Sequence, residues 1–278
     1  MRINHNLSAM NTQRQLSNNN VSAGKSMEKL SSGYRINRAA DDAAGLSISE
    51  KMRAQIKSLN AASRNAQDGV SLVQTMEGAL TEVSDMLTRA KEIAVQGANG
   101  TYNSADRQAL KSEYDALKNA ITDIAQKTNF NGIYLLKSGV SNVSTYVHYG
   151  EKAGDNLKIS GGNMEATGAN GLGLSVGFSG SLGVVSGARA ALGAVDSAIA
   201  KVNKLRSDFG AIQNRLEHTQ KNLDTTQENL QAAESRIRDV DMAKEMMEFT
   251  KNNILSQAAT SMLAQANQQP QGVLSLLR

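Results

Sequence analysis

The side chains in this chain that could do chemistry are its histidines and its adjacent carboxylates, and neither group forms a recognisable site. The three histidines, His5, His148 and His218, lie far apart and outside any His-Glu-x-x-His pattern. The adjacent Asp41 and Asp42 could act as an acid–base or metal-binding pair. No nucleophile or metal ligand accompanies them in sequence, so helix capping and surface charge are the better interpretation.

The remaining candidate sites are weaker still. Glu77 and Asp85 form another pair of nearby carboxylates without a chemical partner, and Gly180–Gly183 is a lone glycine cluster that favours a turn over a phosphate loop. Cysteine is absent, which excludes disulfides, thiolate metal sites and cysteine nucleophiles. We therefore expect no enzyme, no cofactor and no metal centre.

Charge and hydropathy narrow the function further. The formal charge is +4, but the 30 basic and 26 acidic residues are interspersed, and aromatic residues do not alternate with basic ones. This pattern favours a mixed-charge helical surface over nucleic-acid binding. No apolar stretch approaches the ~20 residues of a membrane span. Residues 1–16 contain no apolar core of a conventional secretory signal, so none is expected.

The clearest periodic segment of the chain lies between residues 56 and 94. Apolar or small residues recur there at alternating steps of three and four, which is typical of coiled coils. The first series is Ile56, Leu59, Ser63, Ala66, Val70, Val73, Leu80, Ser84, Leu87 and Ala94. An offset series is Leu72, Met76, Ala79, Val83, Met86, Ala90 and Ile93. Two seams predict a helix with more than one neighbour. A helix over 56–96 would be ~60 Å long, which indicates an elongated molecule.

Similar stripes predict helices over 1–34, from about 104 to 128, over 189–240 and over 242–265. The short connection after Gly97–Gly100 predicts antiparallel packing of two of them, and Asn103 or Ser104 is the expected cap. Residues 36–49 are expected to form a connector with short helical turns. The glycine-rich middle predicts small hairpins, with candidate strands at Ile133–Leu136, Val143–Tyr149 and Leu157–Ser160. The predicted fold is mainly α: an elongated antiparallel helical bundle or coiled coil with a small β-hairpin region.

Several long segments at both ends resemble bacterial flagellins. The segments are Met1–Asn6, Lys29–Gly33, Arg35–Ala39 and Asp41–Leu46 at one end, and Asn214–Glu217, Ala232–Ala243 and Leu263–Gln268 at the other. The resemblance covers roughly Met1–Leu136 and Ala191–Arg278. Because the middle of the chain is short, the resemblance implies a short flagellin without the variable outer domains.

The resemblance implies a structural subunit that polymerises into the bacterial flagellar filament for motility. Residues 1–42 and 236–278 would pair as an inner coiled coil, with 43–56 as a connector. Residues 57–188 and 189–235 would form the outer helical rod, with β-hairpins at about 133–188. A hook–filament junction protein and a non-flagellar coiled-coil adaptor are the alternatives. The subunit would be extracellular, exported by the flagellar type III system without a cleaved signal peptide.

The resemblance also implies partners and the residues that meet them. The subunit itself, an export chaperone, and the filament cap and hook-junction proteins are the bacterial partners. The residues for polymerisation and chaperone binding are Met246, Phe249, Ile254, Leu255, Met262 and Leu263. The receptor-binding residues, for Toll-like receptor 5 of a host, are Arg89, Ile93, Gln96 and Glu113. The tail read by inflammasome sensors is Leu274, Leu276 and Leu277.

Overall fold

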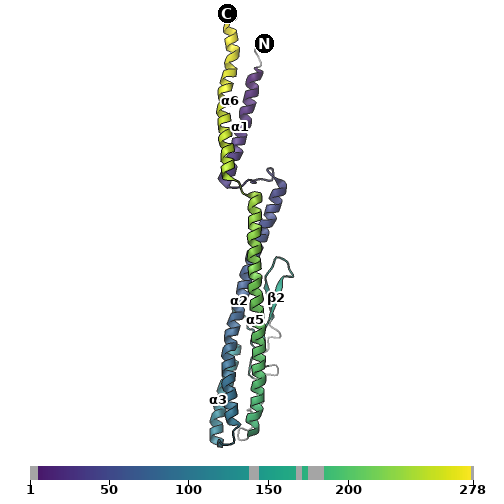
Figure 1. The fold of residues 1–278 in the computed structure, drawn as a ribbon, viewed down its shortest axis with the longest axis vertical. Coiled ribbons are helices and arrows are strands. Elements are labelled where there is room, and N and C mark those ends of the chain that lie inside the picture. Colours follow the sequence, from purple (N-terminus) through teal and green to yellow (C-terminus); the bar gives the residue numbers. More distant parts are fainter. Residues whose placement is uncertain (1–5, 138–143, 167–170, 175–184, 277–278) are drawn as a thin grey trace. The chain divides into compact units, whose positions relative to one another are not determined.

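The computed structural model describes residues 6–137, 144–166, 171–174 and 185–276, and it is mainly α-helical, as predicted (Figure 1). The elements in chain order are α1 (Leu7–Ser32), α2 (Ala43–Gly97), α3 (Ser104–Lys127), β1 (Ser144–His148), β2 (Asn156–Ser160), α5 (Val185–Arg238) and α6 (Met242–Leu276). They divide into two compact units. The terminal unit comprises residues 1–56 and 228–278, and the central unit comprises residues 57–227. No helix in the described part of the chain is both long and apolar enough to cross a membrane.

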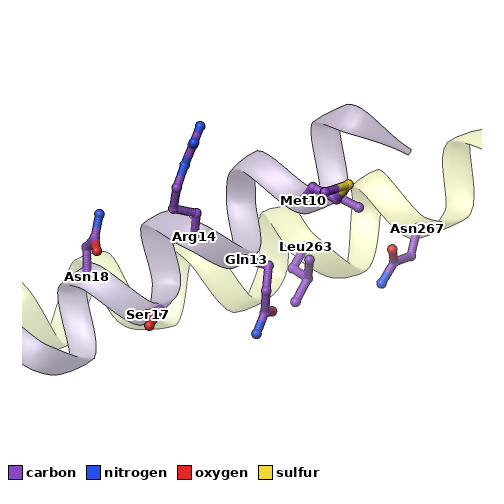
Figure 2. Close-up of a pocket in the computed structure, with 8 residues that line it drawn as sticks. Met10, Gln13, Arg14, Ser17, Asn18, Leu263 and Asn267 are labelled. Atoms are coloured by element: carbon purple, nitrogen blue, oxygen red, sulfur yellow. The ribbon is translucent and has the colours of Figure 1, made fainter. Parts of the chain in front are cut away.

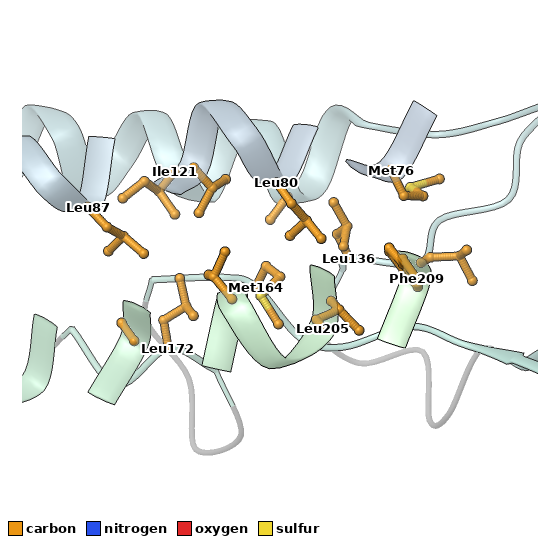
Figure 3. Close-up of a cluster of buried hydrophobic side chains, with 14 of the residues drawn as sticks. Met76, Leu80, Leu87, Ile121, Leu136, Met164, Leu172, Leu205 and Phe209 are labelled. Atoms are coloured by element: carbon orange, nitrogen blue, oxygen red, sulfur yellow. The ribbon is translucent and has the colours of Figure 1, made fainter. Parts of the chain in front are cut away.

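The core of the central unit lies where α2, α3 and α5 pack together. Figure 3 shows Met76, Leu80 and Leu87 of α2 facing the same interior as Ile121 of α3 and Phe209 of α5. Each of these five side chains is fully buried. Both predicted seams of α2 contribute to this core, so the expectation of more than one neighbour is confirmed.

The start of α3 is determined by its own sequence. Asn103 is the cap: its side chain accepts a hydrogen bond from the Asp106 N–H at 2.8 Å. The Asp106 carboxylate accepts one from the Asn103 N–H at 3.4 Å, which completes a capping box. On the inner face of α3, burial raises the pKa of the Tyr114 phenol to about 12. The predicted cap and the packing of α3 on α2 are both confirmed.

Helix α2 begins at Ala43, earlier than its periodic seam predicted. The Asp42 carboxylate accepts a hydrogen bond from the Gly45 N–H at 2.9 Å, as a capping residue does. Asp41 accepts from the N–H of Arg38 at 3.0 Å, and this bond lowers the pKa of Asp41. Residues 43–49, expected in a connector with short turns, are therefore regular helix. Most of these residues are small, so the segment lacks the clear alternation of apolar and polar residues from which a helix is predicted.

Within its described residues, the glycine-rich middle contains one antiparallel pair of strands. β1 and β2 pair with Val147 opposite Leu157, which confirms two of the three predicted strands, although Val143 lies outside the described residues. The predicted strand at Ile133–Leu136 is wrong. Phe130 and Ile133 instead exchange backbone hydrogen bonds of 3.0 and 2.9 Å across a tight turn. Asn131 and Gly132 both have positive φ there, which suits a two-residue hairpin turn.

Gly69 of α2 lies against the β1–β2 hairpin, and its lack of a side chain leaves room for that hairpin. A Cβ atom at Gly69 would lie 3.0 Å from a methyl of Val147 and 3.2 Å from a methyl of Leu216. We expect Gly69→Val to lower the free energy of unfolding by about 1–3 kcal/mol, because added methyls would push these side chains off their rotamers. Gly78→Ala is the control: nothing lies within 4 Å of its Cβ position. It should leave stability unchanged or raise it by up to about 1 kcal/mol. Urea denaturation measures both variants, and equal stability of Gly69→Val and the parent chain would contradict the packing.

Candidate interaction surfaces

The terminal unit is built on an antiparallel pair of helices, α1 and α6, which lie side by side in Figure 1. At one end the Asn6 side-chain amide donates to the Ala266 carbonyl at 2.7 Å. Further along, the Ser256 hydroxyl donates to the Asn20 side chain at 2.8 Å. The predicted pairing of the N- and C-terminal helices is thus confirmed.

The other end of this pair is held by a polar cluster around Tyr34. Two guanidinium groups lie near its ring, with Arg238 at 4.9 Å and Arg53 at 5.3 Å from the ring centre. Arg53 also donates to the Tyr34 hydroxyl at 3.0 Å and to the buried carboxylate of Glu234 at 3.1 Å. Arg238 pairs with Glu50. Gly33, with φ of 74°, lets the backbone turn out of α1 at this point.

The apolar residues of α6 lie on more than one side of the helix, and α1 covers only part of them. Met246, Ile254, Leu255 and Met262 are 49%, 60%, 43% and 58% exposed. Phe249 and Leu263 are half-buried. Leu274 and Leu276 belong to the last turns of α6, and Leu277 lies outside the described residues. Exposed apolar side chains of this number on one helix are typical of a surface that contacts further protein chains.

Helix α1 adds exposed apolar side chains to the same unit. Leu7, Met10, Val21 and Met27 are between 57% and 70% exposed. A groove of about 660 Å³ runs along the two helices. Figure 2 shows Met10 and Gln13 of α1 and Leu263 and Asn267 of α6, which line it. So many uncovered apolar side chains on both helices indicate an interaction surface for further protein chains.

A second candidate surface lies on the central unit, where α2 faces α3. The Arg89 guanidinium donates to one oxygen of Glu113 at 2.8 and 2.9 Å and to Glu92 at 2.9 Å. The hydrogen bond to Glu113, followed by the one to Glu92, raises the pKa of Arg89. Gln96 is exposed on α2. Three of the four residues of the expected receptor surface are therefore exposed, and two of them are in direct contact.

The fourth residue requires a correction. Ile93 is fully buried and belongs to the core cluster, so its side chain is not on the exposed face with Arg89 and Gln96. Four residues turn a helix by roughly 400°, which places Ile93 about 40° round from Arg89 and inside the second seam. Val95, which is 54% exposed, is an apolar residue that α2 does present to solvent near Gln96.

The described residues do not assemble the scattered titratable groups into a centre. No group of three or more His, Asp or Glu side chains suited to a metal ion occurs in the described part of the chain. His148 is at the end of β1 and His218 is on α5, whereas His5 lies outside the described residues. The candidate functional features in the described residues are therefore surfaces. The polar cluster around Tyr34 holds together one end of the α1–α6 helix pair.

Both ends of the sequence match known protein families. Residues 3–141 match the bacterial flagellin N-terminal helical region, and residues 192–277 match the bacterial flagellin C-terminal helical region. Flagellin of Bacillus subtilis strain 168 is 52% identical over an alignment of 316 residues that covers 100% of both chains. The flagellar filament 33 kDa core protein of Treponema phagedenis is 50% identical and also covers 100% of both.

A solved structure shares the fold at low identity. A protein from Vibrio parahaemolyticus, described as a flagellar hook-associated protein, has a TM-score of 0.59 and 16% sequence identity. The similarity covers 72% of this chain and 100% of that one. It supports the helical fold alone.

Proposed function

This chain belongs to the bacterial flagellin family, and from that premise we propose that its two units form different parts of a filament. The chain is a structural subunit that polymerises into the bacterial flagellar filament. The terminal unit would form the inner part of that polymer, and the central unit would form the outer wall. The uncovered apolar side chains on both helices of the terminal unit carry this proposal.

Sedimentation of the purified full chain tests the assembly. Filaments seeded with preformed fragments should pellet and show ordered helical repeats by electron cryo-microscopy. A hook–filament junction protein or a coiled-coil adaptor would instead stay in solution as a small oligomer of defined size. Such an oligomer under filament-forming conditions would contradict the proposal.

The same apolar surface needs a cover before assembly, and we assign that role to a helical export chaperone. Ile254, Leu255 and Met262 are exposed on α6. An unassembled chain in the cytoplasm would therefore present an apolar surface that is prone to aggregation. A chaperone with an apolar groove would hold α6 by a helix-in-groove contact. In this proposal the subunit then leaves through the flagellar type III channel and meets the cap and hook-junction proteins outside the cell.

A second proposed function is recognition of the monomer by Toll-like receptor 5. The exposed pair of Arg89 and Glu113, with Gln96 further along α2, supports this contact. Arginine is enriched among the residues that contribute most of the binding energy at protein interfaces. Ile93 would support α2 from the core without touching the receptor. The tail of Leu274, Leu276 and Leu277 stays a proposed element for inflammasome sensors on the resemblance alone.

A further inference from the structure

The methionines in the described part of the chain differ in exposure between the two units. In the central unit Met76 and Met164 are 0% and 5% exposed, and Met86 is half-buried. Met52, near the boundary of the terminal unit, is also half-buried. Six others, here called the terminal methionines, lie on α1 or α6 and are between 49% and 67% exposed: Met10, Met27, Met242, Met246, Met247 and Met262.

The two close-up views illustrate this difference. Figure 2 shows the Met10 side chain at the groove that it lines together with Leu263. Figure 3 shows Met76 and Met164 among the buried side chains of the central core, together with Leu136. A small molecule dissolved in water therefore reaches the sulfur of Met10 in the unassembled chain, whereas it reaches the two core sulfurs only when the central unit opens.

Exposed thioethers are open to one specific reaction, which is oxidation by a hydroperoxide. The sulfur lone pair attacks one oxygen of hydrogen peroxide, so that an S–O bond forms and the O–O bond breaks. The sulfur loses two electrons and becomes a sulfoxide. The peroxide is reduced, and its second oxygen leaves with both hydrogens as water. Because the chain contains no cysteine, no thiol of the subunit competes for the oxidant.

A sulfoxide on α6 changes a surface that is otherwise apolar. Met247, Ile254, Leu255 and Met262 are spaced by seven or eight residues, so they share one exposed stripe of the helix. The side chains of Ile254 and Leu255 offer no hydrogen-bond donor to a sulfoxide oxygen. In the unassembled chain water solvates that oxygen, so the fold tolerates it. Between packed chains the oxygen would lose its water and remain unsatisfied, which disfavours association.

We propose that the terminal methionines make the free subunit sensitive to hydroperoxides, and that their sulfoxides block assembly without unfolding the central unit. This proposal rests on the proposed role of the terminal unit in the polymer. Assembly covers the same sulfurs, so a finished filament resists the oxidant that inactivates free subunits. The block is reversible, since methionine sulfoxide reductases return each sulfoxide to the thioether.

Peptide mass spectrometry after peroxide treatment of the full-length monomer tests where oxidation occurs, independently of assembly. Each terminal methionine should gain one oxygen at least about tenfold faster than Met76 and Met164, because those two react only after the core opens. In preformed filaments the terminal methionines should react more slowly than in the monomer. Equal rates at exposed and buried methionines of the monomer, or equal rates in monomer and filament, would overturn the proposal. Failure of the untreated chain to form filaments would instead contradict the proposed function.

The critical concentration for assembly, measured by sedimentation, tests the consequence. Oxidation of the parent chain should raise it by at least about tenfold. Treatment with the two methionine sulfoxide reductases and a dithiol should restore the original value. The melting of the central unit, followed by circular dichroism, should stay the same throughout. An unchanged critical concentration after oxidation would overturn the proposal, as would a persistent loss of assembly once mass spectrometry shows that the thioethers are restored.

Leucine variants identify the sulfurs responsible, because leucine has a similar volume and carries no oxidisable atom. The test variant combines Met10→Leu, Met27→Leu, Met242→Leu, Met246→Leu, Met247→Leu and Met262→Leu. Whatever its own critical concentration, peroxide should change that value by less than about twofold. Met86→Leu is the control: it removes one thioether from the central unit and should remain as sensitive to peroxide as the parent chain. Equal sensitivity of the sixfold variant and the parent would overturn the proposal. The reductase experiment uses the unsubstituted chain, so it decides the question even if the sixfold variant does not assemble.

Discussion

A variant that lacks residues 253–278 should stay monomeric under conditions in which the full chain forms sedimenting filaments. The deletion removes the part of α6 that contacts Asn6 and Asn20 of α1. It also removes the exposed side chains of Ile254, Leu255 and Met262. Without this partner, α1 is a helix of 26 residues with several polar positions, and it should fray. Ordering each such residue costs ~1–2 kcal/mol, which only packing can offset.

The central unit should survive the same deletion, because it ends at residue 227 and keeps its buried core. Its cooperative melting transition by circular dichroism is the internal control. A pull-down with the export chaperone extends the test: chain lacking 240–278 should no longer be retained. Normal filaments from the 253–278 deletion would refute the assignment of the terminal unit, and undiminished chaperone binding would refute the shielding role.

Arg89→Ala should weaken binding of the monomer to the receptor by ~2 kcal/mol, or roughly thirtyfold in Kd. Arg89 is held by Glu113 at 2.8 Å and by Glu92 at 2.9 Å, so its guanidinium is oriented before a partner arrives. Removing a preorganised charge at an interface loses its contacts and leaves Glu113 without its cation. Surface plasmon resonance with the receptor ectodomain measures the change, and assembled filaments should bind poorly.

A double-mutant cycle with Glu113→Ala shows whether the two residues act together. Lys127→Ala is the matched control, because Lys127 is in an exposed ion pair with Asp123 at 2.7 Å on the same helix as Glu113. Its effect should be within about 0.5 kcal/mol. If the Arg89→Ala, Glu113→Ala variant bound the receptor as tightly as the parent chain, this surface would not be the recognition site.

Local sequence patterns predicted those parts of the fold that depend on neighbouring residues. The seams of α2, the capping box at Asn103 and Asp106, and two strands of the hairpin all follow from spacing or from residue type. Ile93 shows the limit of such patterns. It fitted both a buried seam and a presumed exposed face, and only packing against the other helices decides between them.

Contacts between distant segments could not be predicted in this way. Arg53 and Glu234 are 181 positions apart, and nothing near either residue indicates that Glu234 will be buried against an arginine. A groove beside Arg215 depends in the same way on the hairpin turn reaching α5. Its residues resemble ordinary helix-surface residues in the sequence, and only the three-dimensional arrangement brings them beside the hairpin turn.

The wide sequence separation of the terminal pair has a consequence for the order of folding. Asn6 and Ala266 are 260 positions apart, whereas Arg89 and Glu113 are only 24 apart. Closing a long loop costs more entropy than closing a short one, so contacts between near neighbours form sooner. We expect α2 and α3 to pair early and α1 and α6 to pair last. A newly emerged subunit would therefore gain a stable core in its central unit before its two terminal helices pair, so the helices that assemble last in the chain would also be the last to become ordered.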